Sequence, residues 1–178
     1  MAQARLISGT VVLDGFAGIG GSAIAFARSG KRVIAVDTNA DRLEMARHNA
    51  GVYGVRDSIT FVHDDFFAVA QRTEADAVNL DPPWGGPTYT AIGRFLLSDF
   101  HPDGHALLQF SLPRFRQVVL RVPRTFDISE LDRFGRSYEI HEDVTGGRTV
   151  SRTVVFRANT SRRTRGVDSG GAATHCSE

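Results

Sequence analysis

The sequence predicts an α/β fold with a mostly parallel sheet of seven strands, helices on both faces and an antiparallel hairpin at the end. Three observations lead to this prediction. Short apolar runs alternate with helical patterns in the first half of the chain, which is typical of parallel strands covered on both faces. Glycine-rich or acidic turns follow these runs. Near the end, two β-like runs flank Gly146-Gly147, a pattern typical of a tight hairpin turn.

Apolar periodicity predicts each element of the first half in turn. Residues 10–13 (TVVL) are expected to form a buried strand that stops at Asp14-Gly15. A helix is expected over residues 20–28, closed by Gly30. The remaining elements expected here are strands at 32–36, 59–62 and 75–80, a helix at 40–51 and a helix beginning at Phe66.

After Pro87 the order of the elements changes. A helix is expected over residues 89–97, whereas periodicity alone leaves 105–112 open between helix and strand. The other expected elements are a strand at 118–122, a short helix at 128–134 opened by Asp127, and β runs at 138–144 and 148–156. A parallel sheet completed by an antiparallel hairpin is the architecture of Rossmann-like class I methyltransferases.

Composition indicates one globular domain. The chain has 178 residues, 42% of them hydrophobic and 23% charged, which suits a single core. We assign residues 1–158 to the domain and expect the small, polar residues 159–178 to form a disordered tail. No apolar run is long enough for a membrane span, so no membrane association is expected.

Cysteine and histidine content bears on the compartment and on metal binding. Cys176 is the only cysteine, which excludes an intrachain disulfide and fits a reducing, intracellular location. The six histidines and one cysteine show no ligand spacing, so we predict no metal site.

The formal net charge of +1 conceals an asymmetry between the two halves. Residues 1–90 carry 8 basic and 10 acidic side chains, and residues 91–178 carry 13 and 10. Arg114, Arg116, Arg121 and Arg124 form a run without acidic residues. Arginine suits phosphate and stacks on bases, but codon usage also explains its abundance, so a polyanion-binding second half stays open.

The turn after the first strand is rich in glycine. Residues 14–21 read DGFAGIGG, where glycines permit a sharp turn and a close approach to a ligand, with Phe16 inside the turn. Gly18, Gly20 and Ala23 also fit G-x-G-x-x-A, with Asp37 nineteen residues after Gly18. This spacing leaves NAD and S-adenosyl-L-methionine as equal candidates, beside a tight turn that binds nothing.

Acidic side chains at three successive strand ends favour S-adenosyl-L-methionine. Asp14 suits a cationic cofactor and would repel a pyrophosphate. Asp37 is placed to accept hydrogen bonds from a ribose. Asp65 could accept from an adenine amine while Phe66 covers the ring, with capping of the helix that begins there as the alternative.

The fourth strand leads into a proline-rich turn, DPPWGGP, at residues 81–87. Pro82 and Pro83 stiffen the chain and leave carbonyl acceptors without amide donors. Asp81 and the carbonyl of Pro82 could hold both N–H groups of an exocyclic amine, positioning its nitrogen for methyl transfer. Trp84, the only tryptophan, would stack on the base. We therefore expect the catalytic residues here, with a structural turn around a core tryptophan as the alternative.

These motifs carry a family resemblance. The D-P-P-[FYW] signature resembles that of methyltransferases acting on amino groups of nucleic-acid bases. The stretches VVLDGFAGIGG, AVDTNADRLEMARHNAGVYGV, HDDFF, DPPWGGPTY and VVLRVPRTFDISEL resemble the trimethylguanosine synthase family of RNA cap guanine-N2 methyltransferases, over residues 10–157. The resemblance implies that Asp14, Asp37 and Asp65 face the cofactor and that Trp84 stacks on 7-methylguanine. It also implies substrate roles for Asn49 and, at the cap phosphates, Arg124.

Some positions depart from that family. Only 13 residues precede Asp14, where the family has a helical segment that closes over cofactor and cap. Thr125 replaces an asparagine, and Asp81 matches a serine in some members. A truncated product, a missing partner or a different acceptor base are the explanations that these departures leave open.

The resemblance implies a function. We expect an enzyme that moves a methyl group from S-adenosyl-L-methionine to N2 of a guanine, first of all in the 7-methylguanosine RNA cap. The alternatives are a guanine-N2 methyltransferase of ribosomal or transfer RNA, a non-catalytic RNA-binding relative, and an NAD(P)-dependent oxidoreductase. We expect a monomer, nuclear or nucleolar in a eukaryote and cytoplasmic otherwise.

Overall fold

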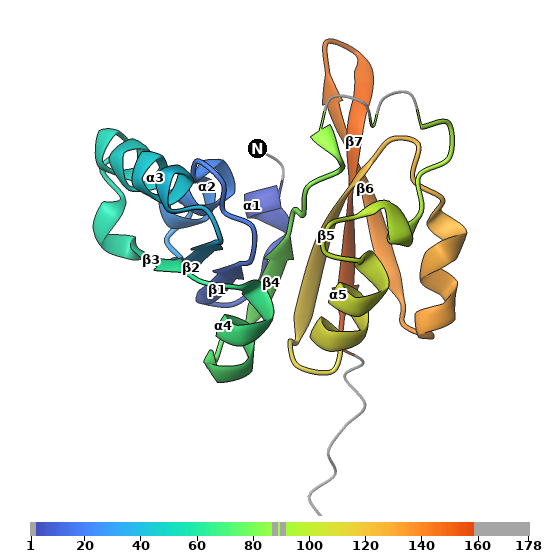
Figure 1. The fold of residues 1–178 in the computed structure, drawn as a ribbon, viewed down its shortest axis with the longest axis horizontal. Helices are drawn as coiled ribbons and strands as arrows, with labels where there is room; N and C mark the ends of the chain where they lie inside the picture. The colour runs from blue at the N-terminus through green and yellow to red at the C-terminus, as the bar shows by residue number, and fades with distance from the viewer. Residues whose placement is uncertain (1–2, 87–88, 90–91, 159–178) are drawn as a thin grey trace, which may run out of the picture.

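The computed structural model describes residues 3–86, 89 and 92–158, so the expected tail lies outside the described residues. Seven strands form one sheet in the order β3-β2-β1-β4-β5-β7-β6 (Figure 1). All neighbours are parallel except those that involve β7, which confirms the predicted fold class. The strands are β1 (Val11–Asp14), β2 (Arg32–Asp37), β3 (Ile59–His63), β4 (Ala77–Leu80), β5 (Gln117–Pro123), β6 (Tyr138–Thr145) and β7 (Arg148–Arg157).

The helices begin mostly where side chains can accept from their first backbone amides. Asn39 accepts from the amide of Arg42 at the start of α3, and Asp103 accepts from that of Ala106 at the start of α5. The helices are α1 (Gln3–Leu6), α2 (Gly21–Arg28), α3 (Ala40–Val52), α4 (Phe66–Arg72) and α5 (Gly104–Ser111), with 3-10 helices η1 (Arg56–Ser58), η3 (Leu97–Asp99) and η4 (Ile128–Phe134).

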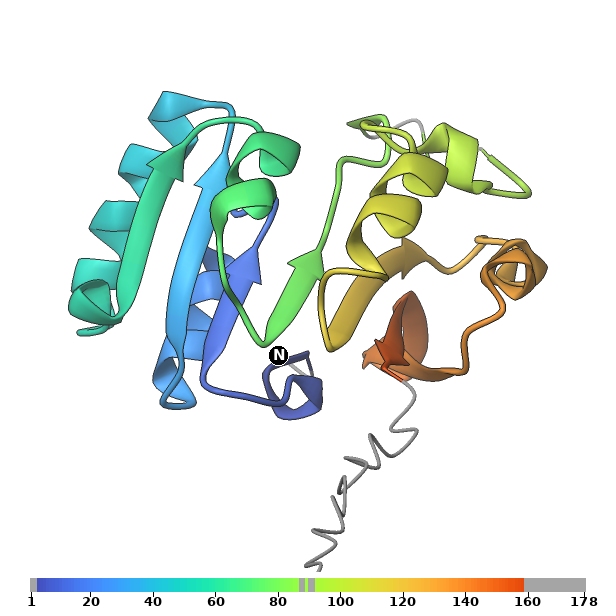
Figure 2. The same cartoon turned by 90° about the horizontal axis from the view of Figure 1, so that it is seen from below.

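The sheet has a separate apolar core on each face, and helices lie on both faces (Figure 2). Helices α1, α2 and α3 cover one face, where Val12 and Val119 are fully buried. Helices α4 and α5 and the 3-10 turns cover the other, where Leu13 and Leu120 are fully buried. Successive residues of a strand point to opposite faces, so a strand buried on both sides must be apolar throughout.

In the second half of the chain, the structure corrects one sequence prediction and resolves one that was left open. The α-helix expected over residues 89–97 does not form: of its described residues, 92–96 are not helical and Leu97 begins the 3-10 helix η3. Phe95 instead makes an isolated β-bridge with Phe126, and its amide donates to the Thr125 carbonyl at 3.0 Å. This long-range pairing competes with the local helical pattern. The segment left open at 105–112 is helical, as α5.

The terminal hairpin forms as expected. Gly146 and Gly147 both have positive φ, 57° and 75°, as a two-residue hairpin turn requires. Because β7 runs antiparallel to β5, this turn lies at the edge of the sheet where β1, β2 and β4 end (Figure 1). The strand order reverses between β1 and β4, which makes that edge the place where α/β sheets bind ligands.

Candidate active site

The glycine-rich loop between β1 and α2 is held from two sides. The amide of Gly15 donates to the Asn79 carbonyl at 3.0 Å, and that of Gly18 donates to Asp37 Oδ2 at 2.8 Å. Gly20 has a φ of +89°, and a Cβ there would lie 3.0 Å from that of Ala46. The backbone geometry and the proximity of α3 therefore both favour glycine at this position.

Asp14 lies at the end of β1 and is fully buried. Its Oδ1 accepts from the side-chain amide of Asn79 at 2.9 Å, while its Oδ2 has no hydrogen-bond partner. Burial raises the pKa of Asp14 to about 7, against the lowering effect of Asn79, and the carboxylates of Asp81 and Asp37 raise it further. A cationic group brought to the loop would stabilise the ionised form of this buried carboxyl, whose Oδ2 has no hydrogen-bond partner.

A cavity of about 480 Å³ opens beside the loop, at the ends of β1, β2 and β3. Asp37 and Asp65 both line it. Asp37 already accepts from Gly18 and, through Oδ1, from the Asn39 amide at 2.9 Å. Asp65 Oδ1 caps α4 by accepting from the amides of Phe67 and Ala68. The capping alternative for Asp65 is therefore confirmed, and its contact with a cofactor stays a prediction.

Phe16 and Phe66 form the apolar part of this cavity. Their ring centroids lie 5.6 Å apart, and Phe66 is only 2% exposed. Phe66 also packs edge-on against Phe67 and Phe110 in the core. Phe66 is thus a fixed wall of the cavity, and an aromatic ring of a ligand could contact it only from the cavity side.

A second cavity, of about 360 Å³, lies at the proline-rich turn after β4. It is lined by Asp81, Pro82, Pro83, Trp84, Gly86, Tyr89 and Arg121. Trp84 packs edge-on against Tyr89, with centroids 5.1 Å apart, and its buried indole nitrogen has no hydrogen-bond partner. The carbonyl of Pro83 accepts from the His101 amide at 3.3 Å, which anchors the turn. Asp81, Pro83 and Gly86 line both cavities, so the two adjoin at this turn.

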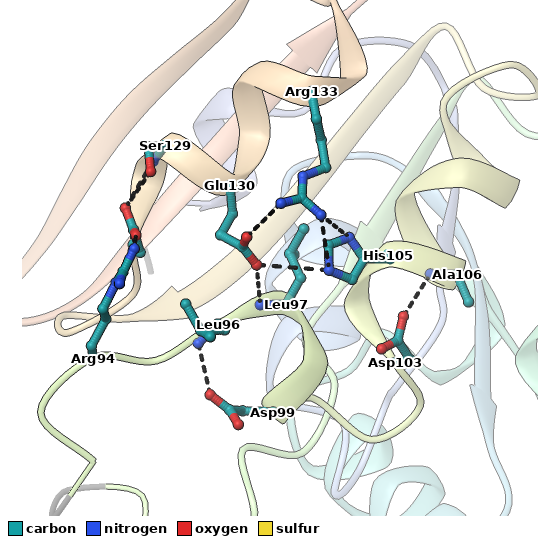
Figure 3. Close-up of polar contacts among 11 residues, drawn as sticks. Arg94, Leu96, Leu97, Asp99, Asp103, His105, Ala106, Ser129, Glu130 and Arg133 are labelled. Carbon is teal, nitrogen blue, oxygen red and sulfur yellow. Dashed lines mark hydrogen bonds and ion pairs between the residues drawn. The ribbon is translucent and has the colours of Figure 1, made fainter.

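The segment after the turn is held by Glu130 of η4 (Figure 3). Glu130 accepts from the Leu97 amide at 3.0 Å and from Arg133 at 2.8 Å, and lies 3.7 Å from the His105 ring. At the other end of this cluster Arg94 pairs with Asp127. These contacts tie Arg94, Leu97 and His105 to η4 and the residue before it, and His101, which lies between them, lines the first cavity.

Asn49 and Arg124 line neither cavity. Asn49 donates to the Ile19 carbonyl at 2.9 Å and so ties α3 to the glycine-rich loop. Arg124 is exposed just after β5, at the same edge of the sheet. Their substrate roles stay predictions.

Three residues of this site were given no role in it from the sequence: Asn79, His101 and Arg121, the last named only within the arginine run. A polar residue inside an apolar strand was the available signal for two of them, Asn79 in AVNL and Arg121 in VVLRVP. His101 carries no local signal, because only the tertiary structure brings it here.

Two features concern metals and membranes. Among the described residues, no group of three or more His, Cys, Asp or Glu side chains is placed to hold a metal ion. Within the same part of the chain, no helix has both the length and the apolar character needed to cross a membrane.

Comparison with known proteins identifies the family. The sequence model of the RNA cap guanine-N2 methyltransferases matches residues 9–162. The chain belongs to that family. Trimethylguanosine synthase of Schizosaccharomyces pombe is 30% identical over 132 residues, covering 70% of this chain and 55% of that protein. The Saccharomyces cerevisiae trimethylguanosine synthase is also 30% identical, over 70% of this chain and 42% of its own length.

Solved structures show the same fold. A methyltransferase from Geobacter sulfurreducens has a TM-score of 0.61 at 16% identity, covering 87% of this chain and 74% of that one. The Pyrococcus abyssi tRNA (uracil-54, C5)-methyltransferase, solved with S-adenosyl-L-homocysteine, has a TM-score of 0.58 at 23% identity. It covers 88% of this chain and 36% of that one.

These comparisons confirm the predicted family resemblance and the class I methyltransferase architecture. Membership of the guanine-N2 methyltransferase family also decides between the cofactors that the glycine spacing left open, in favour of S-adenosyl-L-methionine. The chain spans about half the length of the trimethylguanosine synthases it matches. Its cavity, the carboxylates that line it and the unpartnered Oδ2 of Asp14 fit a cofactor with a cationic, amino-acid-bearing portion.

Proposed function

We propose that this chain transfers a methyl group from S-adenosyl-L-methionine to the exocyclic N2 of a guanine in RNA, with the 7-methylguanosine cap as first candidate acceptor. The observation that carries the proposal is the pair of adjoining cavities. Asp81, Pro83 and Gly86 line both, so a base in one would meet a cofactor in the other at this turn. The family description and the trimethylguanosine synthase relatives support guanine N2 as the acceptor.

Asp37, Asp65 and Phe66 would hold the cofactor in the larger cavity, with Asp14 behind the loop supplying negative charge. When bound, the cofactor supplies an electrophilic methyl group on a sulfonium. Asp81 accepts from the acceptor amine through Oδ1, since its Oδ2 is paired with Arg121. The Pro82 carbonyl is the second acceptor in the turn, because that of Pro83 already receives the His101 amide. These contacts hold the amine nitrogen with its lone pair toward the neighbouring cavity.

Trp84 provides the stacking surface for the base. An aromatic contact of this kind contributes about 1–3 kcal/mol per base. A guanine within folded RNA must leave its stack to reach the turn, whereas a cap guanine is already at a chain end. Accessibility therefore favours the cap.

The second candidate acceptor is an unmethylated guanine of ribosomal or transfer RNA. The observation in its favour is the Arg121 guanidinium, 5.5 Å from the centroid of the Trp84 ring. Because 7-methylguanine itself carries a positive charge, that arginine would disfavour it relative to neutral guanine.

The test measures transfer of labelled methyl to 7-methylguanosine-capped RNA, to the same RNA with an unmethylated cap, and to total ribosomal and transfer RNA. With the first RNA as substrate, Asp81→Ala should lower the rate at least about 100-fold. Trp84→Ala should lower kcat/KM about 10- to 100-fold and leave cofactor binding intact. Tyr53→Ala, at an exposed aromatic directly after α3, is the matched control and should change neither.

Each outcome of this test selects one of the candidate functions. Transfer to ribosomal or transfer RNA alone would replace the cap by the second candidate. Cofactor binding without transfer to any RNA would identify a non-catalytic relative. Binding of NAD in place of S-adenosyl-L-homocysteine in calorimetry would overturn the proposal altogether.

A further inference from the structure

A polar network lies behind the proline-rich turn, and the mechanism above uses only one of its contacts, the Arg121–Asp81 pair. Its centre is Arg121 of β5, whose Nη1 lies 3.2 Å from Asp81 Oδ2. The strand register explains this pair: Leu80 of β4 is aligned with Leu120 of β5, so the residues that follow them are neighbours. The same guanidinium lies over Trp84. One side chain therefore contacts both residues expected to hold the base.

The hairpin holds Arg121 from its other side. Arg121 Nε donates to Ser151 Oγ at 3.2 Å. Ser151 and Thr153 of β7 in turn donate to Asp143 Oδ2, at 2.7 and 3.2 Å. Both hydroxyl residues are buried, at 1% and 0% exposure. Buried hydroxyls cost stability unless they are bonded, so this network has one defined arrangement, and it fixes the guanidinium.

The guanidinium of Arg121 also affects the ionisation of Asp81. Burial raises the pKa of Asp81, the positive charge and hydrogen bond of Arg121 lower it, and Asp143 raises it. The charges that act on Asp81 are those of Arg121 from β5 and Asp143 from β6, and Asp81 itself raises the pKa of Asp14 on β1. Arg42 and His101 line the larger cavity together with Asp81 but do not act on its pKa, so Arg121 is the one cation that does. Without it three carboxyl groups would face one another in a poorly hydrated space.

We propose that Arg121 is a positioning residue that keeps Asp81 in its carboxylate form and holds Oδ2, so that Oδ1 faces the acceptor amine. A protonated carboxyl would present a donor to the amine and lose part of its accepting capacity. Ser151 and Asp143 act one step further back by orienting the guanidinium. The role of Asp81 in this inference rests on the proposed function, whereas the Arg121–Asp81 coupling is measurable without it.

The first experiment observes Asp81 directly. Carboxyl carbons of ¹³C-labelled aspartate are followed by NMR against pH, and the Asp81 signal is assigned by its absence in Asp81→Asn. In Arg121→Met the midpoint should rise by about one pH unit or more, because the opposing charge is lost. Ser151→Ala should raise it by a smaller amount and is the second variant if Arg121→Met does not fold. Arg152→Met, which removes the nearby Arg152–Glu142 pair on the same hairpin, is the matched control and should not move it.

The second experiment follows kcat/KM for methyl transfer against pH. The acid limb should move in Arg121→Met by the amount seen in NMR, so at pH values below both midpoints the loss should approach about tenfold more than at pH 9. Arg121→Lys should restore the position of the limb in part, since lysine keeps the charge but lacks the fork that reaches both Asp81 and Ser151. An unmoved or lower Asp81 midpoint in Arg121→Met overturns the inference, whatever happens to activity. A raised midpoint without transfer to any RNA supports the coupling and refutes the proposed function instead.

Discussion

Replacing Asp14 by asparagine should stabilise the protein at pH 8 much more than at pH 5. Burial is the main reason that the Asp14 pKa lies at about 7, whereas an aspartate in an unfolded chain titrates near about 3.9. Between these two values the folded chain keeps a proton that the unfolded chain has lost. Stability therefore falls as pH rises from about 4 to about 7, and it stays low above that range.

The magnitude follows from the size of the pKa difference. Each pKa unit corresponds to about 1.4 kcal/mol, so about three units imply roughly 4 kcal/mol in full. Of this, about 2–3 kcal/mol develops between pH 5 and pH 8. Asparagine has nearly the same shape and does not ionise. The free energy of unfolding of Asp14→Asn relative to wild type should therefore rise by about 2–3 kcal/mol across that interval.

Urea unfolding followed by circular dichroism, in the absence of cofactor, measures this difference. With a denaturant slope of about 2–3 kcal/mol per molar, the midpoint of the variant should gain about 1 M relative to wild type between pH 5 and pH 8. Asp41→Asn, at an exposed position in the first turn of α3, controls for the substitution itself. A variant-to-wild-type difference that is equal at the two pH values, or smaller at pH 8, would refute the reasoning. Asp14→Asn should also bind S-adenosyl-L-methionine more weakly. The buried carboxyl would then favour cofactor binding at the expense of stability.

Substitutions at three further positions test other parts of the structure. Glu130→Ala removes the acceptor for the Leu97 amide and should lower stability by about 1–3 kcal/mol in thermal unfolding; an unchanged Tm would contradict this role. Gly20→Ala should cost about 1–3 kcal/mol and weaken cofactor binding in calorimetry, because of its positive φ and the nearness of Ala46; wild-type affinity would show that the loop tolerates a side chain. Asp65→Ala removes the cap of α4 and should cost about 0.5–2 kcal/mol in urea unfolding. Asp65→Asn should recover most of that stability, and equal losses in both variants would argue against capping.

The parts of the site encoded by local patterns were predictable from the sequence. Asp14, Asp37 and Asp81 each end or directly follow an apolar strand, so parallel pairing alone brings them to one edge. The glycine-rich loop likewise follows from composition. In the case of Asp65, the sequence left capping and cofactor contact open, and both fit the structure because the cap uses only Oδ1.

The remaining parts depend on long-range contacts. Arg121 meets Asp81 through the register of two strands 40 residues apart, and Asn49 reaches the Ile19 carbonyl across 30 residues. The helix expected over 89–97 was wrong for a similar reason, since the bridge to Phe126 determines its described part. Pairings of this kind leave no trace in local periodicity.

The direction of β5 limits how much a nucleic-acid backbone could contribute to binding. Arg116 precedes this strand and Arg124 follows it, which puts them roughly 25 Å apart at opposite edges of the sheet. The run of arginines between residues 114 and 124 is therefore spread along a strand and does not form one basic face. Of this run, only Arg121 and Arg124 lie toward the edge that carries Trp84, so the run by itself could offer a ligand there at most two cationic contacts. Contacts of that kind position a nucleic acid, whereas the single base held at the turn would carry the selectivity.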